Sequence, residues 1–214
     1  KLLKEKFNKS FIVLVGTHPT ATVEETLNNS DAIDAIARKE YDYIIRDLAI
    51  CLNQNGQLDY VKGLSYKNGG EIIHNLDREL IENLDDIPYA SKFIKKHLDI
   101  YDYSFPAATF PAIQIFTGRG CPARCNYCVY PQVMHGHIYR KRSVENVVNE
   151  FQYIADNFPD IKEIVIEDDT FTIDKKRVVD ICDLLIQKGL NKRFSWLCNA
   201  RVNLDYETMI KMKA

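Results

Sequence analysis

Three cysteines stand close together in a spacing that suits a metal centre. Cys121, Cys125 and Cys128 form a C-x3-C-x2-C pattern directly after an apolar, strand-like run at residues 112–117. Three thiolates at this spacing suit a cubane [4Fe–4S] cluster in which one iron keeps an open coordination position. Because an open iron can bind and reduce a substrate or a cofactor, the sequence predicts redox chemistry at this loop.

Two other uses of these cysteines remain open on the residues alone. A structural zinc site would take His135 or His137 as its fourth ligand, although the x3 gap is unusual for zinc sites, which usually pair C-x2-C units. Disulfides are the other alternative in a chain with six cysteines, but clustering at metal-ligand spacing favours a reducing compartment. We therefore expect metal-bound thiolates in a cytoplasmic protein.

The composition is ordinary for a soluble globular protein: of 214 residues, 46% are hydrophobic and 27% are charged. The formal net charge of -2 gives no basic footprint, so we expect no nucleic-acid partner. No apolar run approaches the roughly 18 residues of a membrane helix, and the first residues are not expected to be a signal peptide. Because the chain starts at Lys1 without an initiator Met and stops inside an apparent helix at Ala214, we expect an internal fragment.

The first part of the chain predicts a small α/β unit. Five consecutive apolar residues at 11–15 indicate a strand buried on both faces, and residues 16–20 are expected to be a loop at its carboxyl end, where open sheets bind ligands. A short helix is expected at 23–29 and an amphipathic helix at 41–54. Alternating segments around Lys67-Asn68-Gly69-Gly70 predict a β-hairpin.

The part after the cysteine loop predicts regular βα units. A helix capped by Ser143, a strand at 161–166, a helix at 175–187 and a strand at 194–199 follow one another. Such units build either a doubly wound sheet or a barrel, and both place chemistry at the carboxyl ends of the strands. The basic run at 140–142 is either a solvated helix entry or a phosphate site.

The cysteine motif, read as C-x3-C-x-Φ-C with Tyr127 as the aromatic residue, resembles the radical S-adenosylmethionine (SAM) superfamily. The resemblance implies that SAM chelates the open iron and is cleaved by one electron to a 5′-deoxyadenosyl radical, which takes a hydrogen atom from the substrate. It also implies an electron donor such as flavodoxin or ferredoxin. Tyr127 would pack against an aromatic cofactor ring, or only against its own loop.

The N-terminal residues Gly16-Thr17-His18-Pro19-Thr20-Ala21, together with the hairpin and Asn75-Leu76-Asp77-Arg78, resemble the cobalamin-binding class of this family. By this resemblance Gly16, Thr17 and His18 line the site of the cobalamin nucleotide tail, and His18 is not expected to bind cobalt.

The fold class implied is α/β: the C-terminal half of a Rossmann-like B12-binding domain, followed by the first βα units of a partial TIM-type barrel. Residues 1–75 would form the partial cobalamin domain with its hairpin and residues 76–111 a connecting segment. Residues 112–214 would form the N-terminal part of the barrel. The connecting segment is rich in aromatic side chains that would be costly in water, so we expect it to pack on the domains.

Further residues of the site follow from the same resemblance. Glu167, Asp168 and Asp169 match the acidic motif that accepts hydrogen bonds from the SAM amino group, although some of them can instead cap the following turn. Period-2 alternation places Asn199 and Arg201 on one face of the third strand, where the arginine would pair with a carboxylate of SAM or substrate, or else lie on the surface.

Four stretches are similar to the hopanoid-biosynthesis branch of this class: residues 119–125, 142–148, 168–172 and 198–201. We therefore expect a cobalamin-dependent radical SAM enzyme that performs methyl transfer or radical rearrangement at an unactivated carbon of a small molecule or a hopanoid-like lipid. The alternatives are a radical SAM enzyme without cobalamin and a zinc-stabilised binding module.

Overall fold

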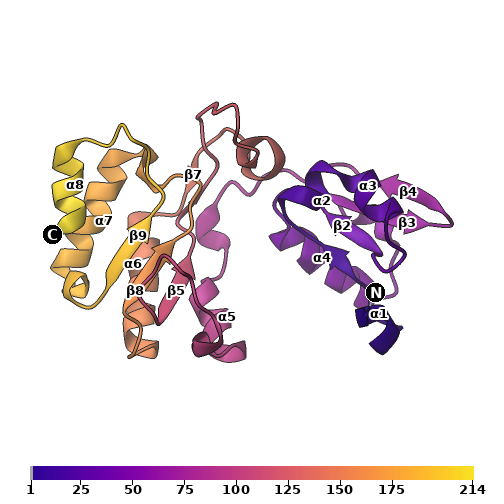
Figure 1. Cartoon of the computed structure of the whole chain (residues 1–214), viewed down its shortest axis with the longest axis horizontal. Helices are drawn as coiled ribbons and strands as arrows, with labels where there is room; N and C mark the ends of the chain where they lie inside the picture. The colour runs from indigo at the N-terminus through magenta and orange to yellow at the C-terminus, as the bar shows by residue number, and fades with distance from the viewer. Residues whose placement is uncertain (1) are drawn as a thin grey trace. The chain divides into compact units, whose positions relative to one another are not determined.

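A computed structural model describes residues 2–214 and divides the chain into two compact units (Figure 1). The first unit comprises the residues up to Ile81 together with Ala123–His137, and the second comprises Glu82–Pro122 and Ile138–Ala214. Each unit has its own β-sheet and its own hydrophobic core. Both are α/β in character, as the sequence predicts.

The first unit is built on a four-stranded sheet in the order β1-β2-β3-β4. Its strands are β1 (Val13–Leu14), β2 (Ala35–Ala37), β3 (Leu64–Asn68) and β4 (Glu71–His74). The first two strands pair in parallel, and the other pairs are antiparallel. The predicted hairpin is confirmed, and its two turn residues both have the positive φ, +59° and +95°, that a type I′ turn requires.

Helices and apolar strand residues form the core of the first unit. Its helices are α1 (Leu2–Lys6), α2 (Thr17–Ala21), α3 (Val23–Asn28), α4 (Asp42–Asn53), the 3-10 turn η1 (Leu58–Tyr60) and the π-helical turn η4 (Pro131–His135). The predicted amphipathic helix is confirmed as α4, whose Ile44 and Leu48 are buried against Ala35, Leu64 and Tyr66 of the sheet.

The loop predicted at residues 16–20 is instead the helical turn α2. Gly16 begins it with a φ of +108°, and its carbonyl accepts a hydrogen bond from the amide of Thr20. Pro19 lies in the first turn of this helix, where its missing N–H has no intrahelical partner to lose. The sequence suggested a loop because glycine and proline usually interrupt helices, but here each occupies a position that a helix start tolerates.

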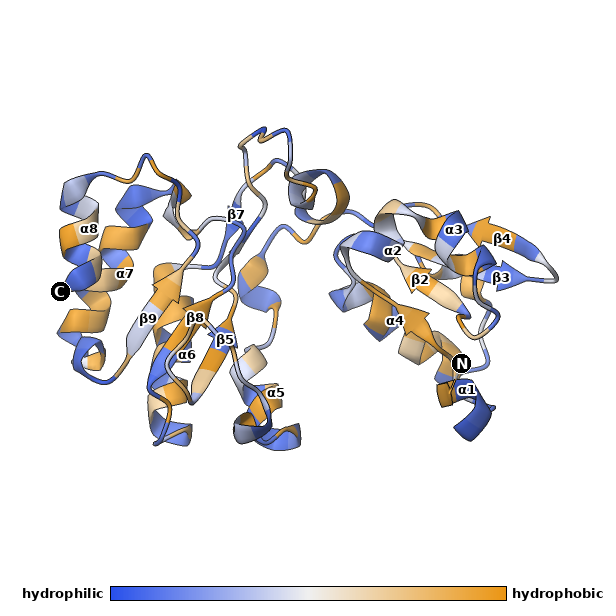
Figure 2. Cartoon of the chain, in the orientation of Figure 1, coloured by the Kyte–Doolittle hydropathy of each residue, from blue (hydrophilic) through white to orange (hydrophobic). Residues whose placement is uncertain are grey.

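The second unit contains a parallel three-stranded sheet in the order β5-β8-β9, with each strand followed along the chain by a helix (Figure 1). The strands are β5 (Ala112–Ile115), β8 (Glu163–Ile166) and β9 (Ser195–Cys198), and the helices are α6 (Val144–Asn157), α7 (Lys175–Gln187) and α8 (Tyr206–Lys213). This succession of strands and helices matches the prediction. β8 is buried along its whole length, which agrees with its largely apolar colouring in Figure 2.

The core of the second unit lies between the sheet and its helices. Fully buried side chains from β5, β8, α6 and α7 meet there, among them Ile113, Ile164, Phe151 and Ile181. Trp196 and Cys198 also pack against this core, whereas Ser195 is exposed, which agrees with the predicted alternation along β9 for these three residues.

The connecting segment is more ordered and more exposed than its sequence suggests. It contains the helix α5 (Ala90–His97) and the 3-10 turns η2 (Leu84–Asp86) and η3 (Ile100–Asp102). The expectation that its aromatic residues are covered is wrong for Tyr101, Tyr103 and Phe110, which are 52%, 54% and 46% exposed. Tyr101 still finds partners, because its ring contacts Phe110 edge-on and its hydroxyl donates to Asp160 at 2.8 Å.

Shorter elements complete the second unit: β6 (Gly118–Arg119), β7 (Arg140–Lys141), η5 (Phe171–Ile173) and η6 (Leu190–Lys192). Ser143 caps α6 as predicted, since its hydroxyl accepts a hydrogen bond from the amide of Asn146 at 3.2 Å. Within residues 2–214, no helix combines the length and the apolar character that crossing a bilayer requires.

A pair of glycine substitutions tests the packing of the first unit. Gly63 has a φ of +83°, and a Cβ there would lie 2.4 Å from Cδ1 of Ile44, whereas a Cβ on Gly69, at φ +59°, would meet nothing within 4 Å. Gly63→Ala should therefore cost about 2–4 kcal/mol of unfolding free energy, and Gly69→Ala only about 1 kcal/mol for its backbone conformation. Urea denaturation measures both, and equal losses would contradict this packing.

Candidate functional site

The carboxyl ends of the parallel strands gather most of the predicted site residues. The cysteine loop follows β5, the acidic residues follow β8, and Asn199 follows β9. Hydrogen bonds join these ends: the amide of Gly120 donates to Asp169 Oδ2 at 2.7 Å, and Asn199 Nδ2 donates to the carbonyl of Asp168 at 3.0 Å. The expectation that chemistry-bearing residues meet at one edge of this sheet is therefore confirmed for these three strands.

Asp168 ties the end of β5 to the end of β8. Its carboxylate is 1% exposed and accepts two hydrogen bonds from Thr117, one from the amide and one from the hydroxyl, each at 2.6 Å. Burial raises the pKa of Asp168 above its ordinary value, while the bonds from Thr117 and the charge of Arg177 oppose this shift. Both of its oxygens are thus engaged by the protein itself.

The other predicted partners of SAM are more accessible. Glu167 is half-buried and accepts a hydrogen bond from Gln114 Nε2 at 3.3 Å, and Asp169 is also half-buried. Arg201 lies beyond β9 with an exposed side chain. Tyr127 is 88% exposed. Within the acidic run 167–169, the carboxylates of Glu167 and Asp169 are therefore more accessible than that of Asp168.

The three cysteines are all free thiols, as are the other three in the chain. Cys121 is buried in the second unit with its Sγ 3.6 Å from Oγ1 of Thr170, whereas Cys125 and Cys128 are half-buried in the segment grouped with the first unit. Among residues 2–214, no three His, Cys, Asp or Glu side chains converge in a metal-holding geometry. The ligand assignment of the cysteines therefore stays a prediction.

The chemistry of the donor set and of its backbone fits an iron–sulfur cluster. Three unbridged thiols within one short loop are the ligands that such clusters take. Gly120 has a φ of +83°, and a Cβ on Gly118 would lie 2.9 Å from the ring of Tyr139 and 3.1 Å from Asp168. Glycine therefore suits both positions, Gly120 because of its backbone conformation and Gly118 because of close neighbouring side chains.

The residues predicted to line the cobalamin site lie at the carboxyl end of β1. Gly16 precedes α2, and Thr17 and His18 occupy its first turn, with His18 exposed. In the same unit Thr20, one turn further along α2, approaches Met134 of η4 with its Oγ1 4.0 Å from the sulfur. The segment that follows the cysteines thus packs on the helix that carries the predicted cobalamin residues.

The predicted alternatives for the basic run are wrong for Arg142. Its side chain is buried, and its guanidinium pairs with Glu150 at 2.5 Å and donates to the carbonyl of Phe116 at 2.6 Å. Glu150, from α6, also accepts a hydrogen bond from the hydroxyl of Ser91 at 2.8 Å. The sequence does not reveal this ion pair for two reasons. Its partners lie eight residues apart, which is not the spacing of a pair within one helix, and a glutamate on an amphipathic helix is usually exposed to solvent.

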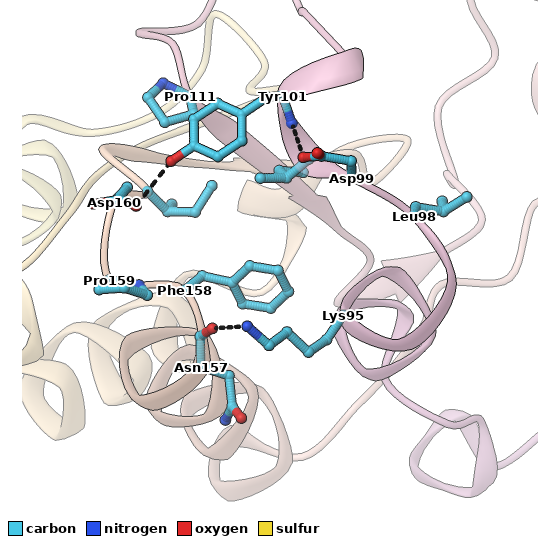
Figure 3. A pocket seen from close by; sticks show the side chains of 11 residues that line it. Lys95, Leu98, Asp99, Tyr101, Pro111, Asn157, Phe158, Pro159 and Asp160 are labelled. Carbon is cyan, nitrogen blue, oxygen red and sulfur yellow. Dashed lines mark hydrogen bonds between the residues drawn. The ribbon is translucent and has the colours of Figure 1, made fainter.

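A cavity of about 300 Å³ lies at the opposite edge of the sheet (Figure 3). It is lined by residues that precede β5 and β8, including Pro111 and Asp160, and so lies at the amino ends of these strands. Its polar groups are paired among themselves: Lys95 donates to the carbonyl of Asn157, and the hydroxyl of Tyr101 donates to Asp160. The cavity is therefore separate from the site at the carboxyl ends.

Comparison with known proteins finds a family model that matches part of this chain and relatives that match nearly all of it. Residues 115–213 match the family model described as the radical SAM superfamily. An uncharacterised methyltransferase of Pyrococcus horikoshii is 35% identical over 99% of this chain and 44% of its own length. An anaerobic magnesium-protoporphyrin IX monomethyl ester cyclase of Cereibacter sphaeroides is 26% identical over 94% of this chain and 32% of its own. The chain thus spans less than half the length of these relatives.

Two solved structures share the fold. The cobalamin-dependent SAM radical enzyme OxsB, with aqua-cobalamin and SAM bound, matches with a TM-score of 0.69 and 25% identity over 87% of this chain and 26% of that one. The radical SAM methyltransferase TsrM of Kitasatospora setae, with cobalamin and a [4Fe–4S] cluster bound, matches with a TM-score of 0.72 and 14% identity over 99% of this chain and 41% of that one.

Substitutions of Asp168 test its role in joining the strand ends. Asp168→Ala leaves the Thr117 amide unpaired and should cost about 2–4 kcal/mol of unfolding free energy at pH 7. Asp168→Asn should cost less, because an amide can still accept from the Thr117 amide and can donate to its hydroxyl.

The pH dependence of the same variants gives a second readout. Because burial raises the pKa of Asp168 in the folded state, the wild type loses stability as pH rises through the ordinary aspartate value, whereas the asparagine does not titrate. The stability of Asp168→Asn relative to the wild type should therefore improve between pH 4 and pH 7 in urea titrations. A constant difference, or equal losses in both variants, would show that this carboxylate is not buried and bonded as described.

Proposed function

We propose that this chain, which belongs to the radical SAM superfamily through residues 115–213, is part of an enzyme that uses a [4Fe–4S] cluster, SAM and cobalamin. The observation that carries this proposal is the three-cysteine loop. This loop lies within the matched residues and follows β5, the first strand of the parallel sheet. The enzyme class follows from this family, and the cofactors, the fold details and the substrate are proposals for this chain.

The proposed architecture assigns a role to each part of the chain. Residues 1–75 form the C-terminal half of a Rossmann-like cobalamin domain, residues 76–111 connect, and residues 112–214 form the first part of a TIM-type barrel. The parallel β5-β8-β9 sheet with its helices supports the barrel, and the parallel pairing of β1 with β2 supports the Rossmann-like half. The likeness to OxsB supports the combination of both in one chain.

In the proposed site, Cys121, Cys125 and Cys128 hold the cluster, which when bound supplies the electron that SAM cleavage requires. Glu167 and Asp169 accept hydrogen bonds from the SAM ammonium group, since both side chains are partly accessible and a carboxylate binds an ammonium strongly.

The remaining residues of the predicted set support the same site. Asp168 fixes the end of β5 next to the acidic residues through its bonds to Thr117, so its contribution to SAM binding is to position them. Asn199 and Arg201 offer a polar side chain and a cation to a carboxylate, and Tyr127 offers a ring to the cofactor.

We propose cobalamin as the second cofactor, bound along Gly16, Thr17 and His18 after β1. A loop and helix start at the carboxyl end of a parallel strand is the usual ligand position in open α/β sheets. The names of the relatives also support it, since OxsB is described as cobalamin-dependent and the Pyrococcus relative as a methyltransferase. Methyl transfer is accordingly the first outcome to test, and radical rearrangement at an unactivated carbon is the second.

The substrate we propose is a small molecule or lipid, with a hopanoid-like lipid as the first to assay because of the motif similarity at residues 119–125 and 198–201. The reducing partner is a flavodoxin or ferredoxin, and the compartment is the cytoplasm, where free thiols persist.

Anaerobic reconstitution of the full-length protein with iron and sulfide tests the proposal. The expected result is a brown protein that forms 5′-deoxyadenosine or S-adenosylhomocysteine from SAM and retains cobalamin through gel filtration. Turnover without retained cobalamin would support a radical SAM enzyme that does not use it. A colourless protein holding one zinc would overturn the proposal in favour of a zinc-stabilised module.

A cysteine substitution tests the ligand assignment. Cys125→Ala should abolish SAM cleavage and reduce bound iron, because a cluster with only two protein thiolates is not held. Cys51→Ala is the matched control: this cysteine lies on α4, away from the motif in sequence, and its Sγ contacts the carbonyl of Gln57. Product analysis and iron content measure both variants, and SAM cleavage that persists in Cys125→Ala would show that this thiol is not a ligand.

A further inference from the structure

The cysteine loop leaves and re-enters the second unit at one place. Just before the cysteines, Gly118 and Arg119 form β6, which pairs in antiparallel fashion with Arg140 and Lys141 of β7 after them. The amide of Arg142 also donates to the carbonyl of Thr117 at 2.9 Å. The two ends of the loop are therefore joined at a base, which lies at the carboxyl end of β5.

Arg177 reaches this base from α7 and bonds to both of its ends. Its side chain is buried, and its guanidinium donates to the carbonyl of Thr117 at 2.8 Å, before the loop. After the loop it donates to the carbonyl of Arg142 at 3.1 Å and to the hydroxyl of Tyr139 at 3.2 Å. Tyr139 in turn packs against Gly118, where no Cβ would fit without a shift.

The hydrogen bonds of Arg177 are separate from the contacts that dock α7 on the sheet. Val178, Ile181 and Leu185 are buried and attach the helix to the core through apolar contacts. The guanidinium of Arg177 lies 5.8 Å from the ring centroid of Phe171 in this core, but its described side-chain hydrogen bonds go to the loop base. A planar guanidinium with five donors on three nitrogens is suited to bridging several separate acceptors, whereas a lysine has three donors on a single nitrogen.

The bridged residues lie next to the predicted ligand environment. From Thr117 the chain runs through Gly120, whose amide is bonded to Asp169, to the buried thiol of Cys121. A shift of the base would therefore move Cys121 relative to the acidic residues after β8.

We propose that Arg177 is a positioning residue that closes the base of the cysteine loop and thereby holds Cys121 in place for the cluster. This inference rests on the proposed function for the role of the cluster, but the closure of the loop base is a property of the protein alone.

The test compares Arg177→Met and Arg177→Lys with Arg193→Met in the full-length protein. Arg193 is a matched control, because its guanidinium also donates to three backbone carbonyls, those of Phe158, Pro159 and Ile161, but ahead of β8 at the opposite edge of the sheet. A general loss of stability should affect both methionine variants alike, whereas positioning of the cysteine loop should be lost only at Arg177.

Two readouts are measured: the alkylation rate of Cys121 in the metal-free protein, resolved by mass spectrometry, and the rate of iron loss to a chelator after reconstitution. Arg177→Met should raise each rate at least about tenfold, because lost charge-assisted hydrogen bonds favour local opening, and Arg177→Lys should fall between it and the wild type. Arg193→Met should leave both rates within about twofold of the wild type.

Equal rates in Arg177→Met and the wild type, or equal increases in both methionine variants, would overturn the inference. If the wild type binds no cluster, the proposed function fails, and the alkylation rate still decides whether Arg177 closes the base. If circular dichroism shows that Arg177→Met is unfolded, the comparison is made with Arg177→Lys, for which a rate equal to that of the wild type contradicts the inference.

Discussion

The organisation of the second unit depends on the two hydrogen bonds by which the buried carboxylate of Asp168 holds Thr117. They join the carboxyl ends of β5 and β8 at the point where the chain leaves the sheet to form the cysteine loop. A carboxylate at 1% exposure carries a desolvation penalty that these bonds and the charge of Arg177 offset only in part, so the pKa of Asp168 stays above its ordinary value. Because these bonds are short and buried, they fix the chain just before Cys121 next to the chain that carries the acidic residues.

Two buried arginines extend this arrangement across the layers of the unit. Arg142, immediately after β7, pairs with Glu150 of α6, and Arg177 of α7 bonds to the base of the cysteine loop. Each guanidinium also donates to a main-chain carbonyl of the segment that follows β5, those of Phe116 and Thr117. The carbonyls of Phe116 and Thr117 in this irregular segment are thereby bonded by Arg142, which lies between β7 and α6, and by Arg177 of α7, as buried backbone outside a ladder requires.

The sequence predicts the regular elements well because their apolar periodicity is strong. The helices α4, α6 and α7, the hairpin and the parallel strands follow from it, and the gathering of the acidic residues and the cysteine loop at one sheet edge follows from the strand order. The sequence does not reveal the helical turn α2, because Gly16 and Pro19 are of residue types that usually interrupt helices. It also does not reveal the roles of Arg142 and Arg177, because a charged side chain is buried only when distant residues supply its partners. Tyr127 and Arg201 cannot be assigned from local pattern, since both are exposed.

The central claim is that the cysteine loop holds a [4Fe–4S] cluster whose open iron binds SAM. Electron paramagnetic resonance of the reduced, reconstituted full-length protein, recorded without and with SAM, tests it most directly, because the signal reports the coordination of the cluster itself. The account predicts a reduced [4Fe–4S] signal whose g-values shift when SAM is added. A protein without this signal, or a signal that SAM leaves unchanged, would contradict it.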